Sequence, residues 1–82
     1  MSLDIASTLE RFIVDELMMS DKNTRVDPDA SLLSSGVVDS LSLLRLISFI
    51  EERFGVTVAD GEVVPENFET INIMKSFVTA KL

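Results

Sequence analysis

The chain has 82 residues, of which 46% are hydrophobic, and it combines a formal net charge of −7 with a complete lack of cysteine and histidine. This length suits one domain covering residues 1–82, and the abundant Leu, Ile, Val and Phe exclude a disordered chain. The missing cysteine excludes disulfides and thiolate metal sites, and without the commonest general base and the strongest nucleophile the chain is not expected to be an enzyme.

The first predicted element is an amphipathic helix over about residues 3–19, with Ser2 as its N-cap. Its apolar residues recur at helical spacing on one side, at Ile5, Leu9, Phe12, Ile13 and Leu17. The residues before it have neither the basic start nor the apolar run of a signal peptide, and no stretch approaches the length of a membrane span. A cytoplasmic protein is therefore expected.

A long connection without regular structure is expected at residues 20–38, where Asp27-Pro28-Asp29 is a typical turn sequence. A connection of this length is unusual inside a small domain and usually has a function. Its apolar residues Ala30, Leu32 and Leu33 are expected to anchor it against the helices.

The strongest helical pattern follows, beginning at Asp39 or Ser40, either of which suits the N-cap. Its apolar residues fill most of the helix circumference, at Leu41, Leu43, Leu44, Leu46, Ile47, Phe49 and Ile50. Such a helix is expected to lie centrally between the others. It should end at Phe54-Gly55, because glycine readily adopts the left-handed conformation found at helix C-termini.

Two further helices are predicted after Val56-Thr57-Val58, which is too short to support a sheet. Pro65-Glu66-Asn67-Phe68 indicates a single turn started by its proline. Thr70 should cap a last helix whose apolar residues are Ile71, Met74, Phe77, Val78 and Leu82. The predicted fold is all-α: a small bundle of three main helices and one short helix, with a long loop between the first two main helices.

Residues 36–41, Gly-Val-Val-Asp-Ser-Leu, place a serine at the head of the central helix. After the turn at Gly36, Ser40 stands where the free amides and the positive end of the helix macrodipole converge. A phosphodiester on Ser40 would be stabilised there, and Asp39 would help to hold a divalent cation during phosphate transfer. By itself the stretch is more often an ordinary N-cap before an apolar run, so the wider context decides.

Nearly the whole chain resembles the acyl carrier protein family, which includes peptidyl and D-alanyl carrier domains. The resemblance rests on Asp-Pro-Asp-Ala-Ser-Leu-Leu at 27–33, Gly-Val-Val-Asp-Ser-Leu at 36–41, Glu-Glu-Arg-Phe-Gly-Val at 51–56 and Pro-Glu-Asn-Phe at 65–68. It implies that Ser40, flanked by Asp39 and Leu41, receives 4′-phosphopantetheine from coenzyme A through a separate transferase. The cargo would then be carried as a thioester on this arm.

The resemblance also implies that the central helix is the main docking surface for partners with basic patches. The residues on or near that face are Ser40, Leu41, Arg45, Ser48, Glu51 and Glu52. Glu51 and Glu52 are notable without the analogy, because acids near a helix C-terminus oppose the macrodipole and neither has a base four residues away. Solvation by water explains either acid taken singly. For the two acids taken together, docking to a partner is as good an explanation as solvation.

Three positions depart from the carriers of fatty acid synthesis, which usually have acids where this chain has Ser42, Arg45 and Arg53. The chain is more similar to stand-alone carriers of specialised lipid, polyketide or aminoacyl pathways. We expect a monomeric carrier whose partners are a phosphopantetheinyl transferase, an acyl- or aminoacyl-loading ligase, and a downstream transferase or synthase.

The charge distribution supports an alternative function. Residues 27–69 contain nine acids and two bases, and this difference of seven equals the whole net charge. Such a segment favours basic protein surfaces and repels nucleic acid and anionic membranes. The alternative is therefore an unmodified acidic helical adaptor for a basic partner.

Neither Asp27-Pro28-Asp29 nor Asp60-Gly61-Glu62 has the ligand spacing of a calcium loop, so turns rather than a metal site are expected.

Overall fold

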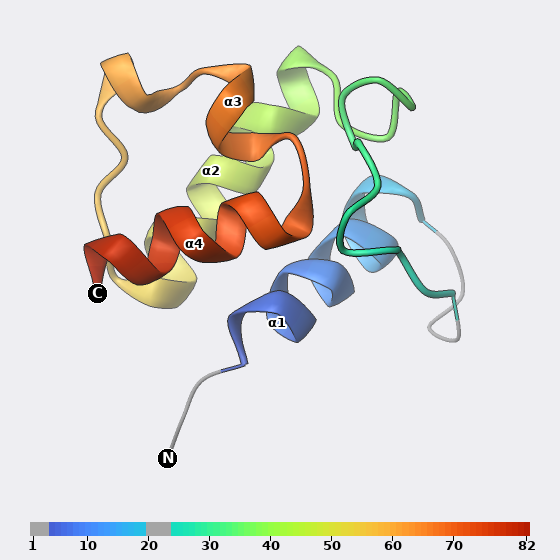
Figure 1. The fold of residues 1–82 in the computed structure, drawn as a ribbon, viewed down its shortest axis with the longest axis horizontal. Coiled ribbons are helices and arrows are strands. Elements are labelled where there is room, and N and C mark those ends of the chain that lie inside the picture. Colours follow the sequence, from blue (N-terminus) through green and yellow to red (C-terminus); the bar gives the residue numbers. More distant parts are fainter. Residues whose placement is uncertain (1–3, 20–23) are drawn as a thin grey trace.

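The computed structural model describes residues 4–19 and 24–82, and every regular element in these two ranges is helical. In chain order the elements are α1 (Ile5–Phe12), the π-helical segment η1 (Ile13–Leu17), α2 (Ser40–Phe54), the 3₁₀ segment η2 (Asp60–Glu62), α3 (Pro65–Phe68) and α4 (Ile71–Lys81). Figure 1 shows the short α3 beside α2 and α4, and the long connection at the end of the bundle opposite the C-terminus. The predicted all-α fold is confirmed.

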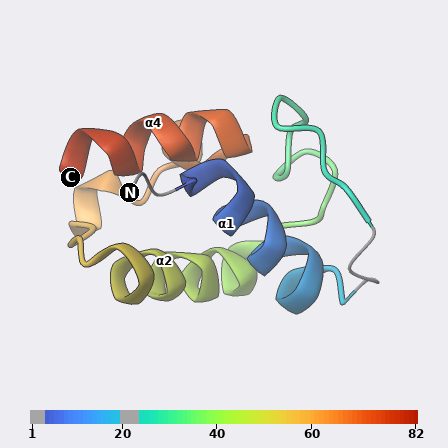
Figure 2. The same ribbon diagram turned by 90° about the horizontal axis from the view of Figure 1, so that it is seen from below.

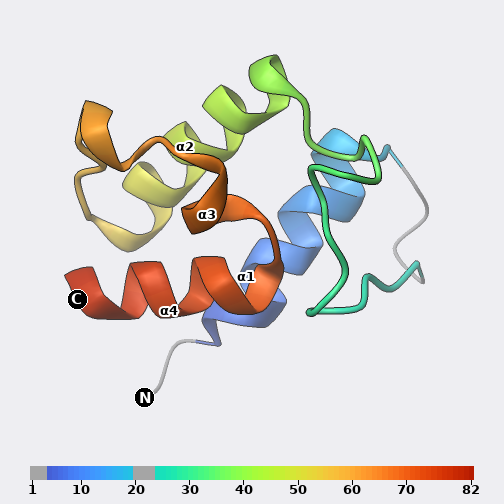
Figure 3. The same cartoon turned by 45° about the horizontal axis from the view of Figure 1, so that its top comes forward.

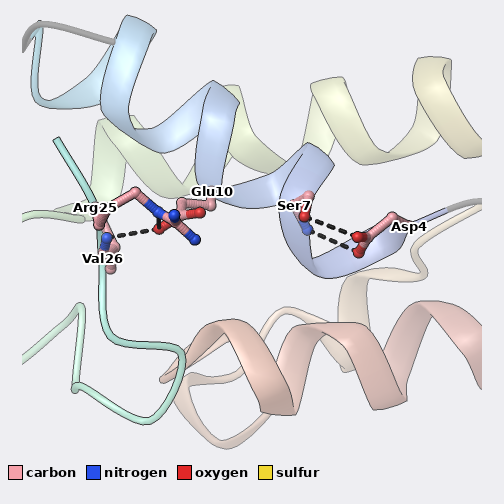
Figure 4. Close-up of polar contacts among 5 residues, drawn as sticks. All are labelled: Asp4, Ser7, Glu10, Arg25 and Val26. Carbon is pink, nitrogen blue, oxygen red and sulfur yellow. Dashed lines mark hydrogen bonds and ion pairs between the residues drawn. The ribbon is translucent and has the colours of Figure 1, made fainter. Parts of the chain in front are cut away.

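The first helix begins later and ends earlier than predicted. Asp4 is its N-cap: the Asp4 carboxylate accepts hydrogen bonds from the Ser7 amide at 3.1 Å and the Ser7 hydroxyl at 2.8 Å (Figure 4). The predicted cap, Ser2, lies outside the described residues. The helix continues without a break into η1 and ends at Leu17, and Met19 has a left-handed φ of 52°. The prediction that Met19 is helical was therefore wrong.

The central helix α2 does not bury all of its apolar residues, which corrects the expectation that it lies centrally between the other helices. Its inward side buries Leu46, Ile47, Ile50 and Phe54. Leu41 and Leu44 are 70% and 58% exposed, because the neighbouring helices cover only part of the α2 circumference. The helix ends as predicted, with Gly55 at a left-handed φ of 67°.

The last two helices follow their predicted boundaries. Pro65 starts α3, and the Thr70 hydroxyl accepts a hydrogen bond from the Ile73 amide at 3.0 Å at the start of α4. The core side of α4 buries Ile71, Met74 and Val78. Leu82, predicted to lie on that apolar side, is 67% exposed because it follows the last helical residue.

The core lies between the helices and includes part of the long connection. Leu32 and Val38 are buried in it, and Leu33 packs against its edge. Ala30 is exposed, so the predicted apolar anchor consists of the leucines. No described helix combines the length and apolarity that a membrane span requires.

Candidate functional site

Ser40 is the first residue of α2, and its side chain lies at the exposed start of that helix. The N-cap is Asp39, whose carboxylate accepts a hydrogen bond from the Ser42 amide at 2.8 Å. This settles which of the two predicted residues caps the helix. Since α2 is 15 residues long, the positive end of a substantial macrodipole lies beside the Ser40 hydroxyl.

Asp39 provides a negative charge next to that hydroxyl. Hydrogen bonds from the amide and the hydroxyl of Ser42 hold the pKa of Asp39 below its ordinary value. Asp39 is therefore ionised at neutral pH. Within the described ranges, no cluster of three side chains suited to a metal ion occurs.

The chain that leads into α2 is fixed by buried backbone contacts. Gly36 makes a turn with φ of 81°, as predicted. The Val38 amide then donates to the Leu32 carbonyl at 3.1 Å, and the Leu32 amide donates to the Glu69 carbonyl at 2.8 Å. Ser40 is thereby positioned relative to the junction between α3 and α4. Figure 3 shows the connection passing the end of η1 before it reaches α2.

Glu10 of α1 holds the beginning of this connection. Its carboxylate accepts hydrogen bonds from the Val26 amide at 2.6 Å and from Arg25 Nε at 3.2 Å (Figure 4). The Val26 amide in particular, and then Arg25, hold the pKa of Glu10 below its ordinary value. The role of Glu10 was not predictable from the sequence, because its partners lie 15 and 16 residues away and no local pattern identifies them.

Asn72 of α4 holds the middle of the connection. Its backbone amide donates to the Pro28 carbonyl at 3.0 Å, and its side-chain nitrogen donates to Asp29 Oδ1 at 2.7 Å. This contact was not predictable from the sequence either, since 43 residues separate Asn72 from Asp29. The connection is therefore tied to α1 and to α4 before it reaches α2.

One side of α2 next to Ser40 is open to solvent. The exposed residues on it are Leu41, Leu44, Arg45, Ser48 and Glu52. Arg45 contacts Glu16 of η1, with its guanidinium 3.5 Å from both the Glu16 carbonyl and the Glu16 carboxylate. The start of this face is therefore apolar, and Glu52 lies at its far end.

Glu51 does not share that exposed face. Its carboxylate accepts a hydrogen bond from the Val58 amide at 2.9 Å, and its side chain is half-buried. Solvation alone, the simple explanation for an acid at this position, is therefore wrong for Glu51. The bond ties the segment after α2 to the helix.

Comparison with known proteins shows which sequences this chain resembles. Residues 4–75 match the protein family described as "Phosphopantetheine attachment site". A D-alanyl carrier protein of Streptococcus suis is 37% identical over 70 residues, which cover 85% of each chain. D-alanyl carrier proteins of Streptococcus mutans serotype c and Streptococcus gordonii are each 36% identical, over 70 and 67 residues, covering 85% and 82% of each chain.

Proposed function

Since this chain belongs to the phosphopantetheine-binding carrier family, we propose that Ser40 is the residue to which its prosthetic group is attached. The family gives the general function: the chain carries an acyl or aminoacyl group on covalently bound 4′-phosphopantetheine, and the alternative of an unmodified adaptor is not favoured. The observation that carries the assignment of Ser40 is its exposed position at the start of α2, directly after the N-cap.

The surroundings of Ser40 fit a phosphodiester. The positive end of α2 lies beside the hydroxyl, and the preceding acid is engaged with the Ser42 amide. Exposure leaves room for a transferase to reach Ser40 and for an arm to leave the surface. The prosthetic group supplies the thiol that this cysteine-free chain lacks. The exposed Leu41 offers the arm an apolar contact beside its attachment point.

The cargo that we propose is an amino acid, with D-alanine as the first candidate. The relatives that support this choice are D-alanyl carrier proteins. The fatty acid and polyketide pathways considered from the sequence have no support among these relatives. The holo protein should accept D-alanine from an ATP-dependent D-alanine ligase, giving a bond that hydroxylamine cleaves. The apo protein should accept none, and loading by other amino acids alone would contradict the choice of D-alanine.

The proposed partners are a transferase that uses coenzyme A and a ligase that loads the arm. We place their contacts on the exposed face of α2, at Leu41, Arg45, Ser48 and Glu52. A basic group of a partner would reach Glu52, whereas Glu51, also predicted to take part, is engaged with Val58. The chain would work as a monomer in the cytoplasm and perform no chemistry on its cargo.

Co-expression with a broad phosphopantetheinyl transferase, followed by intact mass measurement, tests the assignment. The wild type should gain the mass of one prosthetic group. Ser40→Ala should gain nothing, and the matched control Ser42→Ala should be modified like the wild type. An unmodified, folded wild type would overturn the assignment of Ser40, as would a modified Ser40→Ala variant.

A further inference from the structure

A groove of about 490 Å³ lies between the first helix and α2. Figure 2 shows α1 and α2 side by side, with the end of the first helix next to the start of α2. Phe49 and Arg53 line the groove from α2. At 100° per residue these two lie on a different side of the helix from Leu41 and Ser48. The groove therefore borders the face assigned above to docking and meets it at Arg45, which lies one turn before Phe49 and contacts the groove residue Glu16.

Part of the groove lining is aromatic. The rings of Phe12 and Phe49 stack with their centroids 4.2 Å apart and an angle of 20° between their planes. Both side chains are half-buried and both line the groove. The stacked pair thus presents apolar surface that an aliphatic or aromatic side chain of a partner would cover.

Two exposed arginines line the groove, Arg11 from α1 and Arg53 from α2. The other arginines in the described ranges, and Lys81, form ion pairs, with Glu10, Glu16 and Glu62 as the acids. Neither groove arginine forms an ion pair with another described residue. Arg11 is not at a helix end, because η1 continues directly from α1, so the macrodipole does not explain its position.

The negative charges at the groove are fewer than its lining suggests. Asp15 and Glu16 also line it, but Glu16 is paired with Arg45. Two unpaired cations and one unpaired anion remain, Arg11 and Arg53 against Asp15. A local positive excess is unusual in a protein with a net charge of −7. That net charge opposes binding to an anionic membrane or to nucleic acid, whereas a short acidic protein segment meets only the local charge.

We propose that this groove binds an acidic segment of the ligase that loads the carrier. A carboxylate of that segment would pair with Arg11 and Arg53, and an adjacent apolar side chain would cover the Phe12–Phe49 pair. The inference rests on the proposed function. Arg53 lies 13 residues after Ser40 along α2, a rise of roughly 20 Å. A ligase segment held at this end, in addition to the contacts on the exposed face of α2, would therefore leave the arm on Ser40 free to enter an active site.

Loading kinetics of the holo protein test this docking site, with D-alanine ligase as the probe. Arg11→Glu and Arg53→Glu should each raise the KM for the carrier by roughly tenfold, with little change in kcat. Lys75→Glu is the matched control, because Lys75 is also exposed and lies outside the groove. Each variant changes the net charge from −7 to −9, so only a local effect separates them.

The possible outcomes separate this proposal from the proposed function. Equal KM values for all three variants and the wild type would overturn the docking site alone, as would an equal rise in all three. If the wild type gains a prosthetic group but is not loaded by the ligase, both the D-alanyl cargo and the docking site are wrong. If the wild type gains no prosthetic group, the assignment of Ser40 fails first.

Discussion

Asp39 and Ser40 are adjacent residues at the start of α2, and only Asp39 caps the helix. The Asp39 carboxylate stabilises the helix through the Ser42 amide. Because Asp39 is the cap, the hydroxyl of Ser40 is not required for capping and remains available for modification. A serine at the capping position itself would have its oxygen occupied by a helix amide. The proposal that Ser40 is modified therefore depends on its lying one residue after the N-cap rather than at the N-cap itself.

Substitution of Asp39 should separate its structural task from any task in modification. Asp39→Ala removes the cap and should lower the melting temperature by roughly 3–8 °C, whereas Asp39→Asn keeps a good capping residue and should stay close to the wild type. If the carboxylate also helps to hold a cation, Asn should still slow modification by the transferase. Thermal unfolding and initial rates of modification measure the two effects. Equal destabilisation by Ala and Asn would contradict the capping role.

At the scale of elements, the connection before α2 has no regular structure and yet is fixed along its length. Glu10 binds it near Val26, and Asn72 binds it at Asp29. Leu32 then anchors it in the core, close to its junction with α2. The long loop therefore supports the start of α2, and its contacts explain how a connection of this length is held in place.

The tether at Glu10 predicts a specific pH dependence of stability. The folded protein holds the pKa of Glu10 below its ordinary value of 4.5. The stabilisation from this carboxylate is therefore complete above 4.5 and is lost as the pH falls through the lower, folded-state pKa. Glu10→Gln should cost about 1 kcal/mol at neutral pH and flatten the loss of stability on acidification. Urea unfolding across this range measures both effects.

Glu66 provides the matched control for that experiment. It is exposed and forms no ion pair with another residue in the described part of the chain. Glu66→Gln should therefore keep the stability of the wild type at neutral pH. If the stability of the Glu10→Gln variant falls with pH as that of the wild type does, the hydrogen bonds of Glu10 to the connection contribute nothing to stability.

At the scale of the whole molecule, the helices and the connection share one core. Leu32 is 1% exposed within it, although it belongs to a segment without regular structure. Leu32→Ala should lower the free energy of unfolding by about 2–5 kcal/mol, the usual loss for a buried leucine. The half-buried Leu33 provides the control, and Leu33→Ala should cost clearly less. Equal losses in chemical unfolding would mean that Leu32 does not anchor the connection.

Features set by neighbouring residues were predictable from the sequence. The turn at Gly36, the end of α2 at Gly55 and the cap at Thr70 follow from local conformational preferences, and the structure confirms them. The exposure of Leu41 and Leu44 was not predictable, because it depends on how many helices surround α2. Apolar spacing shows which residues can be buried but not how much of the helix finds a partner.

Contacts between distant parts of the chain could not be predicted from the sequence either. Glu51 looks like a solvated acid until the segment after α2 brings the Val58 amide to its carboxylate. The same holds for Asn72 and Asp29, which come together only in the folded chain. The position of Ser40 at the start of α2 was predictable, because the capping pattern and the apolar run that follows it are both local in sequence.

Peptide mapping of the modified wild-type protein tests the central claim most directly. The purified chain is incubated with coenzyme A and an active phosphopantetheinyl transferase, digested, and sequenced by tandem mass spectrometry. We expect the added group on Ser40 alone. Attachment at Ser42, Ser48 or another serine, or a folded chain that stays unmodified beside a control carrier modified in the same reaction, would contradict the account.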